Sequence, residues 1–204
     1  MHHTPTPGPD TFEQLFRESD DPWRFKTRWY EARKRALTLA CLPERHYLSG
    51  YEPGCANGEL SADLATRCDR LLVSDLSERA VELARTRLSG CPHVRVVQAE
   101  LPDGWPNESF DLIVISELGY FLDAQRVDAL ANYARASLMP GGTVLACHWR
   151  RPIQGGELDG DAVHDRLARR LNLKVISEVR EADFVLHVWS DDARSVAERE
   201  GFDW

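Results

Sequence analysis

Several features that mark common protein classes are missing from this sequence. No apolar run approaches the roughly 20 residues that a transmembrane helix needs, and histidine, threonine and proline follow Met1 where a signal peptide would have an apolar core. An excess of basic residues is also missing, because 25 Lys and Arg stand against 33 Asp and Glu, for a formal net charge of -8. Such a charge repels phosphate backbones. We therefore expect a soluble, cytoplasmic protein that binds neither membranes nor nucleic acids.

Motifs for metal, disulfide and serine chemistry are absent as well. The cysteines are odd in number and never form C-x-x-C, so they predict reduced thiols; they are Cys41, Cys55, Cys68, Cys91 and Cys147. No cluster of His, Cys and Asp has the spacing of a metal site, and no G-x-S-x-G elbow for a nucleophilic serine occurs. We expect a protein that uses no metal.

The sequence does contain a regular alternation of apolar runs and helical patterns. Helices are predicted at 59–66, 78–88, 124–138 and 161–171, and strands at 47–52, 71–75, 94–98, 112–116, 143–148, 174–179 and 184–189. The last two strands lie too close together for a crossover helix, which suits a hairpin. This order predicts an α/β fold with a Rossmann-like, seven-stranded, mostly parallel sheet, an antiparallel last strand and helices on both faces.

The length and composition predict a single domain. With 204 residues, 43% of them hydrophobic, the chain can bury one sizeable core. Residues 1–10 are rich in Pro, Thr and His and are expected to be a disordered tail. Residues 11–204 are expected to form the domain, and residues 11–42 within it an N-terminal helical cap of two helices, interrupted at residues 20–22.

The most informative motif follows the first predicted strand. Glu52, Gly54 and Gly58 form an E-x-G-x-x-x-G pattern, and glycines let the backbone turn sharply and lie against a ligand. Asp75 ends the next predicted strand, where a carboxylate can accept hydrogen bonds from both hydroxyls of a ribose. Dinucleotide sites instead use G-x-G-x-x-G around a pyrophosphate. The spacing therefore favours a nucleoside without a pyrophosphate, such as S-adenosylmethionine.

Over residues 47–189 the sequence resembles the class I S-adenosylmethionine-dependent methyltransferases. The loop at 52–58 resembles their first motif, Asp75 their ribose-binding acid, and residues 99–102 the segment whose acid meets the adenine amino group. Residues 110–117 and 138–143 resemble the fourth-strand motif and the turn before the fifth strand. The resemblance implies that the cofactor is bound by Trp29, Glu52, Gly54, Cys55, Asn57, Gly58, Asp75, Leu76, Glu100, Leu101 and Ser116.

Within that class, residues 21–24, 29–31 and 116–122 resemble the nodulation protein S type. This resemblance implies N-methylation of a chitooligosaccharide amine during lipid signal synthesis. Gly119 and Phe121 depart from the type, because they stand where we expect a bulkier residue and a tyrosine. We therefore expect a small-molecule acceptor, an amine or an amino sugar. O-methylation, a non-catalytic partner protein that binds S-adenosylmethionine, and a dinucleotide oxidoreductase are the alternatives.

An amine attacks only when neutral, so a carboxylate, histidine or tyrosine can orient it or take its proton. Glu117 and Tyr120 follow the fourth predicted strand and His148 ends the fifth, so these side chains should open onto the crevice above the sheet. His164 is a further candidate, and His148 can equally be a packed histidine with a satisfied hydrogen bond. Aromatic residues of the predicted cap can exclude water and contact a cation; they are Trp23, Phe25, Trp29 and Tyr30.

Overall fold

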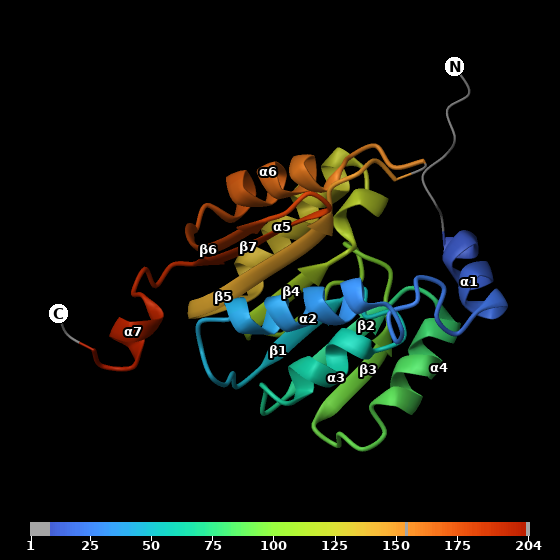
Figure 1. The fold of residues 1–204 in the computed structure, drawn as a ribbon, viewed down its shortest axis with the longest axis horizontal. Helices are drawn as coiled ribbons and strands as arrows, with labels where there is room; N and C mark the ends of the chain where they lie inside the picture. The colour runs from blue at the N-terminus through green and yellow to red at the C-terminus, as the bar shows by residue number, and fades with distance from the viewer. Residues whose placement is uncertain (1–8, 154, 203–204) are drawn as a thin grey trace.

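The centre of the fold is a seven-stranded sheet with the order β3-β2-β1-β4-β5-β7-β6, seen in a computed structural model that describes residues 9–153 and 155–202 (Figure 1). Strands β1 to β5 are parallel to one another, and β7 pairs in an antiparallel manner with both β5 and β6. The seventh strand is therefore the antiparallel one, inserted between β5 and β6, which confirms the predicted fold. The strands are β1 (Gly50–Pro53), β2 (Leu71–Asp75), β3 (Val94–Gln98), β4 (Phe110–Ser116), β5 (Leu138–Trp149), β6 (Lys174–Arg180) and β7 (Phe184–Ser190).

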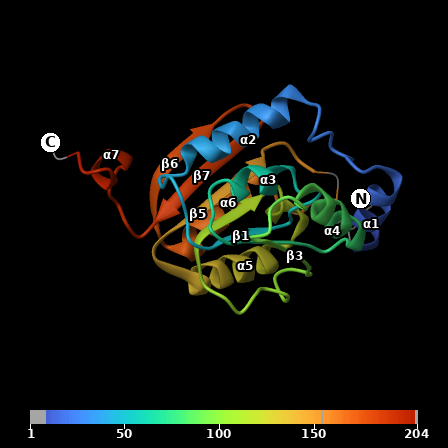
Figure 2. The same ribbon diagram turned by 90° about the horizontal axis from the view of Figure 1, so that it is seen from below.

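Helices cover both faces of this sheet, as Figure 2 shows from a second direction. Helices α5 and α6 pack together on one face, and α2, α3 and α4 lie on the other. Within the described residues, no helix is long and apolar enough to cross a membrane. The helices are α1 (Pro9–Glu18), α2 (Trp29–Cys41), α3 (Glu59–Ala65), α4 (Glu78–Arg87), the 3-10 helix η1 (Gly119–Phe121), α5 (Ala124–Ser137), α6 (Gly160–Leu171) and α7 (Val196–Arg199).

Side-chain caps fix where the main helices begin. Ser77 accepts a hydrogen bond from the third residue of α4, and Asp123 and Asp159 do the same for α5 and α6. Each cap satisfies a backbone N–H that has no partner inside its helix. These caps therefore fix the residues at which the chain enters α4, α5 and α6 on the carboxyl side of the sheet.

Strand β4 shows why the central strands are apolar on both faces. Ile113 and Ile115 pack into the core beneath α5 and α6, while Leu112 and Val114 pack into the core beneath α3 and α4. Successive side chains of a strand point to opposite faces, and a parallel sheet covered on both faces needs apolar residues at every position. The uninterrupted run in β4 is therefore explained by burial on both faces.

The sequence and the structure differ mainly at short or terminal elements. Strand β1 begins at Gly50, because Tyr47 forms only an isolated bridge to Cys68. Helix α1 begins at Pro9, and the rest of the predicted disordered tail, residues 1–8, lies outside the described residues. Helices η1 and α7 had no periodic pattern to predict them, since three and four residues are too few to show one.

The order in which strands are added to the sheet reverses between β1 and β4. Strand β1 pairs with β2 on one side and with β4 on the other, and β3 and β5 lie next to β2 and β4 on their outer sides. The loops after β1 and β4 therefore leave toward opposite faces and open a crevice between them, which is where open α/β sheets bind ligands.

The packing of β5 generates a prediction about stability. Leu145 is 0% exposed in the core beneath α3 and α4, whereas Leu48 is 62% exposed. Leu145→Ala leaves a cavity and should lower the free energy of unfolding by about 2 to 5 kcal/mol. Leu48→Ala, the matched control, should change it by less than about 0.5 kcal/mol. Urea unfolding followed by circular dichroism measures both, and equal effects of the two variants would contradict the assigned core.

Candidate functional site

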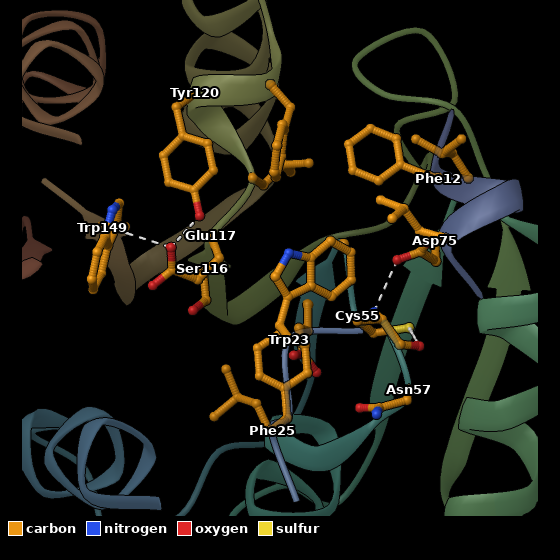
Figure 3. A pocket seen from close by; sticks show the side chains of 18 of the residues that line it. Phe12, Trp23, Phe25, Cys55, Asn57, Asp75, Ser116, Glu117, Tyr120 and Trp149 are labelled. Carbon is orange, nitrogen blue, oxygen red and sulfur yellow. Dashed lines mark hydrogen bonds between the residues drawn. The ribbon is translucent and has the colours of Figure 1, made fainter. Parts of the chain in front are cut away.

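A cavity of about 990 Å³ lies at the carboxyl ends of β1, β2 and β4, and residues of α1, α2 and the loop between these helices also line it. Figure 3 shows its two walls, with the indole of Trp23 between them. The β1–β2 wall comprises Glu52, Gly54, Cys55, Ala56, Asn57 and Asp75, and the β4–β5 wall comprises Ser116, Glu117, Tyr120 and Trp149.

The loop after β1 holds a left-handed backbone. Gly54 has φ +74°, and a Cβ there would meet Leu118 Cδ1 at 3.3 Å. Glycine therefore suits this position both because it adopts a positive φ without strain and because it has no Cβ to crowd Leu118. Ala56 adopts φ 50° although it has a side chain. The backbone N–H groups of Gly54 and Cys55 donate to the carbonyl oxygen of Ser74 at 2.7 and 2.9 Å. These bonds fasten the loop to β2 and hold its strained residue in place.

Two acceptor atoms of this wall lack donors. Glu52 is 2% exposed and Asn57 1% exposed, and neither Glu52 Oε2 nor Asn57 Oδ1 has a hydrogen-bond partner within the described part of the chain. Burial raises the pKa of Glu52 to about 8. Buried acceptors normally find a donor in a native protein. The wall therefore fits a ligand that brings donors, such as an ammonium group.

The amide nitrogen of Asn57, unlike its oxygen, already has hydrogen-bond partners. Its Nδ2 donates to Asp20 O and to Asp21 Oδ1, both at 3.1 Å. Asp21 also accepts from the backbone N–H of Phe25 at 2.8 Å. Asn57 thereby connects the β1–β2 wall to the loop that carries Trp23.

Asp75 is built to receive further donors. Its Oδ2 accepts from Ala56 N at 2.9 Å and its Oδ1 from Ser77 N at 3.0 Å, and each carboxylate oxygen can accept more than one hydrogen bond. Burial raises the pKa of Asp75, and the backbone hydrogen bonds oppose that rise. One free lone pair on each oxygen suits two adjacent hydroxyls. Beside Asp75, the cavity is lined by Leu76, Ala99, Glu100 and Leu101.

Glu117 is the centre of the β4–β5 wall. It follows β4 with φ 54°, a left-handed conformation that is rare for a residue with a side chain. Its Oε1 accepts from Lys34 Nζ at 2.7 Å, and its Oε2 accepts from Trp149 N at 3.0 Å and from the Tyr120 hydroxyl (Figure 3). Burial alone would raise the pKa of Glu117, but Lys34 and these hydrogen bonds outweigh it and lower that pKa. Glu117 therefore stays ionised.

Lys34 lies between two carboxylates. Its Nζ is 2.7 Å from Glu117 Oε1 and 3.1 Å from Glu31 Oε2, and it sits 4.9 Å from the centre of the Tyr30 ring. Burial opposes the charge of Lys34, yet the two carboxylates raise its pKa. Tyr30 lines the cavity, and its buried hydroxyl has no partner among the residues that the structure describes. This end of the cavity thus carries two negative charges, one positive charge and one free hydroxyl.

The structure brings most of the sequence-predicted residues to the cavity. Those that line it are Glu52, Gly54, Cys55, Asn57, Asp75, Leu76, Glu100, Leu101, Ser116, Glu117 and Tyr120. Glu100 contributes least to a closed site, because 61% of its side chain is exposed beside Arg126.

Four predicted residues lie elsewhere, and their placement corrects the sequence interpretation. Trp29 is 78% exposed, because the first turn of α2 directs the neighbouring Tyr30 inward. Gly58 caps α3 against α4, where a Cβ would meet Ala84 Cα at 3.2 Å. His148 is 0% exposed and His164 2% exposed. The two histidines contact each other behind η1 and do not line the cavity.

Sequence reasoning missed Lys34, Glu31 and Trp149 and placed Tyr30 only in the cap. One signal was available: Glu31, Lys34 and Thr38 recur at helical spacing on α2, and all three are buried. Polar residues on the buried face of a helix need partners there. Within the described residues, no group of His, Cys, Asp and Glu side chains could hold a metal ion.

Comparisons with known proteins agree with this geometry. Residues 9–153 match the family model described as Nodulation protein S (NodS). The chain is 34% identical to Nodulation protein S of Rhizobium tropici over 141 residues, which are 67% of this chain but only 59% of that protein's length.

Two solved structures share the fold. A candidate methyltransferase from Pseudomonas syringae is 56% identical, with a TM-score of 0.72, over 80% of this chain and 99% of that one. The N-methyltransferase NodS from Bradyrhizobium japonicum WM9, solved with S-adenosyl-L-homocysteine, has a TM-score of 0.76 at 24% identity, over 88% of this chain and 96% of that one. The match of the family model to most of the chain, with the agreement in fold, shows that this chain belongs to the nodulation protein S family.

Proposed function

We propose that this chain is an S-adenosylmethionine-dependent methyltransferase that methylates the nitrogen of a small amine or amino sugar. The observation that carries the proposal is the pair of unpartnered buried acceptors, Glu52 Oε2 and Asn57 Oδ1, which line the same cavity as Asp75 and Glu117. Family membership and the S-adenosyl-L-homocysteine complex of the Bradyrhizobium protein support it.

The β1–β2 wall fits the donor molecule group by group. Glu52 and Asn57 would receive its ammonium group, Asp75 its ribose hydroxyls, and Leu76 and Leu101 would lie against its adenine ring. S-adenosylmethionine supplies a methyl group on a positively charged sulfur, which is the electrophile of the reaction. Phe12, Phe16, Trp23, Phe25 and Tyr30 of the N-terminal segment line the cavity. We propose that residues 11–42 act as a cap of the single domain and exclude water.

The charge of the β4–β5 wall favours a nitrogen acceptor. In the transfer, the nitrogen lone pair forms the new bond to the methyl carbon, the sulfur–carbon bond breaks, and sulfur keeps the electron pair. The positive charge therefore passes from sulfur to nitrogen. Glu117 and Glu31 outnumber Lys34 at this end of the cavity. The resulting negative charge stabilises the cationic product as it develops.

Tyr120 is the group best placed to handle a proton of the acceptor. Its hydroxyl donates to Glu117, so the lone pairs of its oxygen remain available to accept from an acceptor N–H. Burial and Glu117 raise the pKa of Tyr120 well above its ordinary value, so its hydroxyl keeps its proton. A proton accepted by Tyr120 can pass at the same time to Glu117, which is ionised.

Acceptor-dependent formation of S-adenosylhomocysteine tests the proposal directly. We expect turnover with members of a panel of amines and amino sugars and none with matched alcohols and phenols. Turnover restricted to hydroxyl acceptors would reassign the enzyme to O-methylation. Donor binding without turnover by any acceptor would identify a protein that only binds S-adenosylmethionine.

The buried carboxyl of Glu52 makes donor binding depend on pH. Its pKa is raised to about 8, so at neutral pH the carboxyl is mostly protonated, and an incoming ammonium group must displace that proton. The affinity for S-adenosylhomocysteine should therefore rise by up to about tenfold per pH unit as pH approaches 8, and level off above it.

Calorimetry in two buffers with different ionisation enthalpies measures the released proton. At pH 7 we expect up to one proton released by the parent protein and none by Glu52→Gln. Equal proton release by both proteins would show that Glu52 does not receive the ammonium group.

A tyrosine substitution tests the acceptor side. Tyr120→Phe removes only the hydroxyl and should lower kcat by about 10² to 10⁴-fold, the usual contribution of a positioned acid or base. Donor affinity should stay at the parent value, because Tyr120 belongs to the opposite wall. The matched control is Tyr133→Phe, whose side chain is 45% exposed on α5. Steady-state kinetics and calorimetry measure both effects, and a parent kcat in Tyr120→Phe would remove Tyr120 from the acceptor site.

A further inference from the structure

Three histidines form a hydrogen-bonded chain behind the β4–β5 wall. His148 Nε2 is 3.0 Å from the backbone nitrogen of Gly119, and His148 Nδ1 is 3.0 Å from His164 Nε2. His164 Nδ1 is 2.7 Å from His187 Nδ1, and His187 Nε2 is 3.5 Å from Glu178 Oε1. The chain runs from β5 through α6 to β7 and ends on β6. It therefore connects η1, which carries Tyr120, with the edge of the sheet.

The Gly119 N–H group sets the direction of the whole chain. A backbone nitrogen can only donate, so His148 Nε2 accepts and His148 carries its proton on Nδ1. That proton is donated to His164 Nε2, so His164 carries its own proton on Nδ1 and donates it to His187 Nδ1. The remaining proton of His187 then lies on Nε2, toward Glu178. Each imidazole has one donor and one acceptor in use, and all three are neutral.

Gly119 itself is shaped for this contact. A Cβ at this position would meet Val163 Cγ1 at 2.4 Å and His148 Nε2 at 3.2 Å. A larger residue would displace the imidazole or α6, which explains why glycine stands here in place of the bulkier residue that the family resemblance predicts. Gly119 is buried, so without His148 its N–H would lose its partner away from water. Tyr120 is the next residue, and its ring lies edge-on to His148, with 5.5 Å between ring centres.

An added proton would break this chain. His187 and Glu178 are 14% and 47% exposed, so His187 can take up a proton, and Nδ1 is the ring nitrogen that does not yet carry one. The new N–H would face the N–H at His164 Nδ1, so His164 would lose its acceptor and would no longer be held in place to accept from His148 Nδ1. Burial lowers the pKa of all three histidines, that of His148 to about 4. The charged groups that face the chain are Glu117 and Lys34 at His148, Arg180 at His164, and Glu178, Arg180, Asp161 and Asp165 at His187.

We propose that His148 is a positioning residue for methyl transfer, which fixes Tyr120 against Glu117 through the Gly119 N–H, and that His164 and His187 make this positioning depend on pH. The proposal rests on the function proposed above, because Tyr120 must act on the acceptor for its placement to matter. His148 itself touches neither the donor nor the acceptor.

A double-mutant cycle separates this role from a general structural one. His148→Leu removes the acceptor for Gly119 and should lower kcat on the order of 10²-fold, the cost of a small misplacement of a reacting group, with donor affinity unchanged. His148→Gln supplies an amide oxygen near the position of Nε2 and should restore most of the rate. In a Tyr120→Phe background, His148→Leu should lower kcat no further. Independent, multiplying effects of the two substitutions would overturn the proposal.

The pH dependence tests the outer end of the chain. In the parent, kcat should fall as pH drops below 6.5, the ordinary histidine value, because the pKa of His187 is lowered from there. His187→Asn offers an oxygen near the position of Nδ1 that accepts but does not titrate, so this fall should move to lower pH. His46→Asn is the matched control, since His46 pairs with Asp69 on the surface, away from the cavity. An unchanged pH profile in His187→Asn, measured with the same acceptor, would overturn the pH dependence.

A readout without turnover keeps this proposal separate from the proposed function. Nitrogen-15 NMR of the imidazole rings at neutral pH should show His148 and His164 protonated on Nδ1 and His187 on Nε2. These tautomers stand even if no amine is methylated, in which case only the proposed function fails. Protonation of His148 on Nε2 would contradict the proposed chain of histidine hydrogen bonds, whether or not the protein methylates an amine.

Discussion

The arrangement of the site depends on one buried carboxylate, that of Glu117. Its donors come from three separate elements: Lys34 from α2, the hydroxyl of Tyr120 from η1, and the backbone N–H of Trp149 from the end of β5. A buried charge is tolerated only when it is paired and hydrogen-bonded, and removing one partner of such a pair is strongly destabilising. Glu117 therefore holds the N-terminal segment, the fourth strand's loop and the fifth strand in one arrangement.

The β1–β2 wall differs from this fully paired arrangement, because some of its buried acceptors have no donors. Glu52 and Asn57 are almost fully buried, and one oxygen of each lacks a partner within the described residues. An unsatisfied buried group costs about 1 to 3 kcal/mol of stability. The fold tolerates this cost beside a loop that is fastened to β2 and beside a carboxylate, Asp75, that also has room for more donors. Local conflicts of this kind are expected where a protein binds a ligand.

Strained backbone appears on both walls at corresponding places. Ala56 follows β1 and Glu117 follows β4, and both have positive φ. These are the two strands between which the order of strand addition reverses. Parallel strands bring their carboxyl ends to one edge, so both loops begin at the crevice and leave it toward opposite faces. Behind η1, His148 accepts a hydrogen bond from the buried N–H of Gly119, near one of these turns.

The sequence by itself determined the strand and helix order, because the periodicity of apolar residues is a local property of each element. It also determined the glycine loop at 52–58 and the acid at Asp75, because both lie within one βαβ unit whose geometry is local. That Trp29 faces solvent while Tyr30 lines the cavity could not be predicted. Neighbouring residues of a helix point about 100° apart, but this spacing does not say which of them faces the sheet. Only the tertiary structure decided that Lys34 would pair with Glu117, 83 residues away. It also decided that His148 would accept a hydrogen bond from Gly119 N and would not line the cavity. The physical reason is that buried charges and N–H groups take whichever partner the packing of distant elements brings within reach, and no local pattern records that choice.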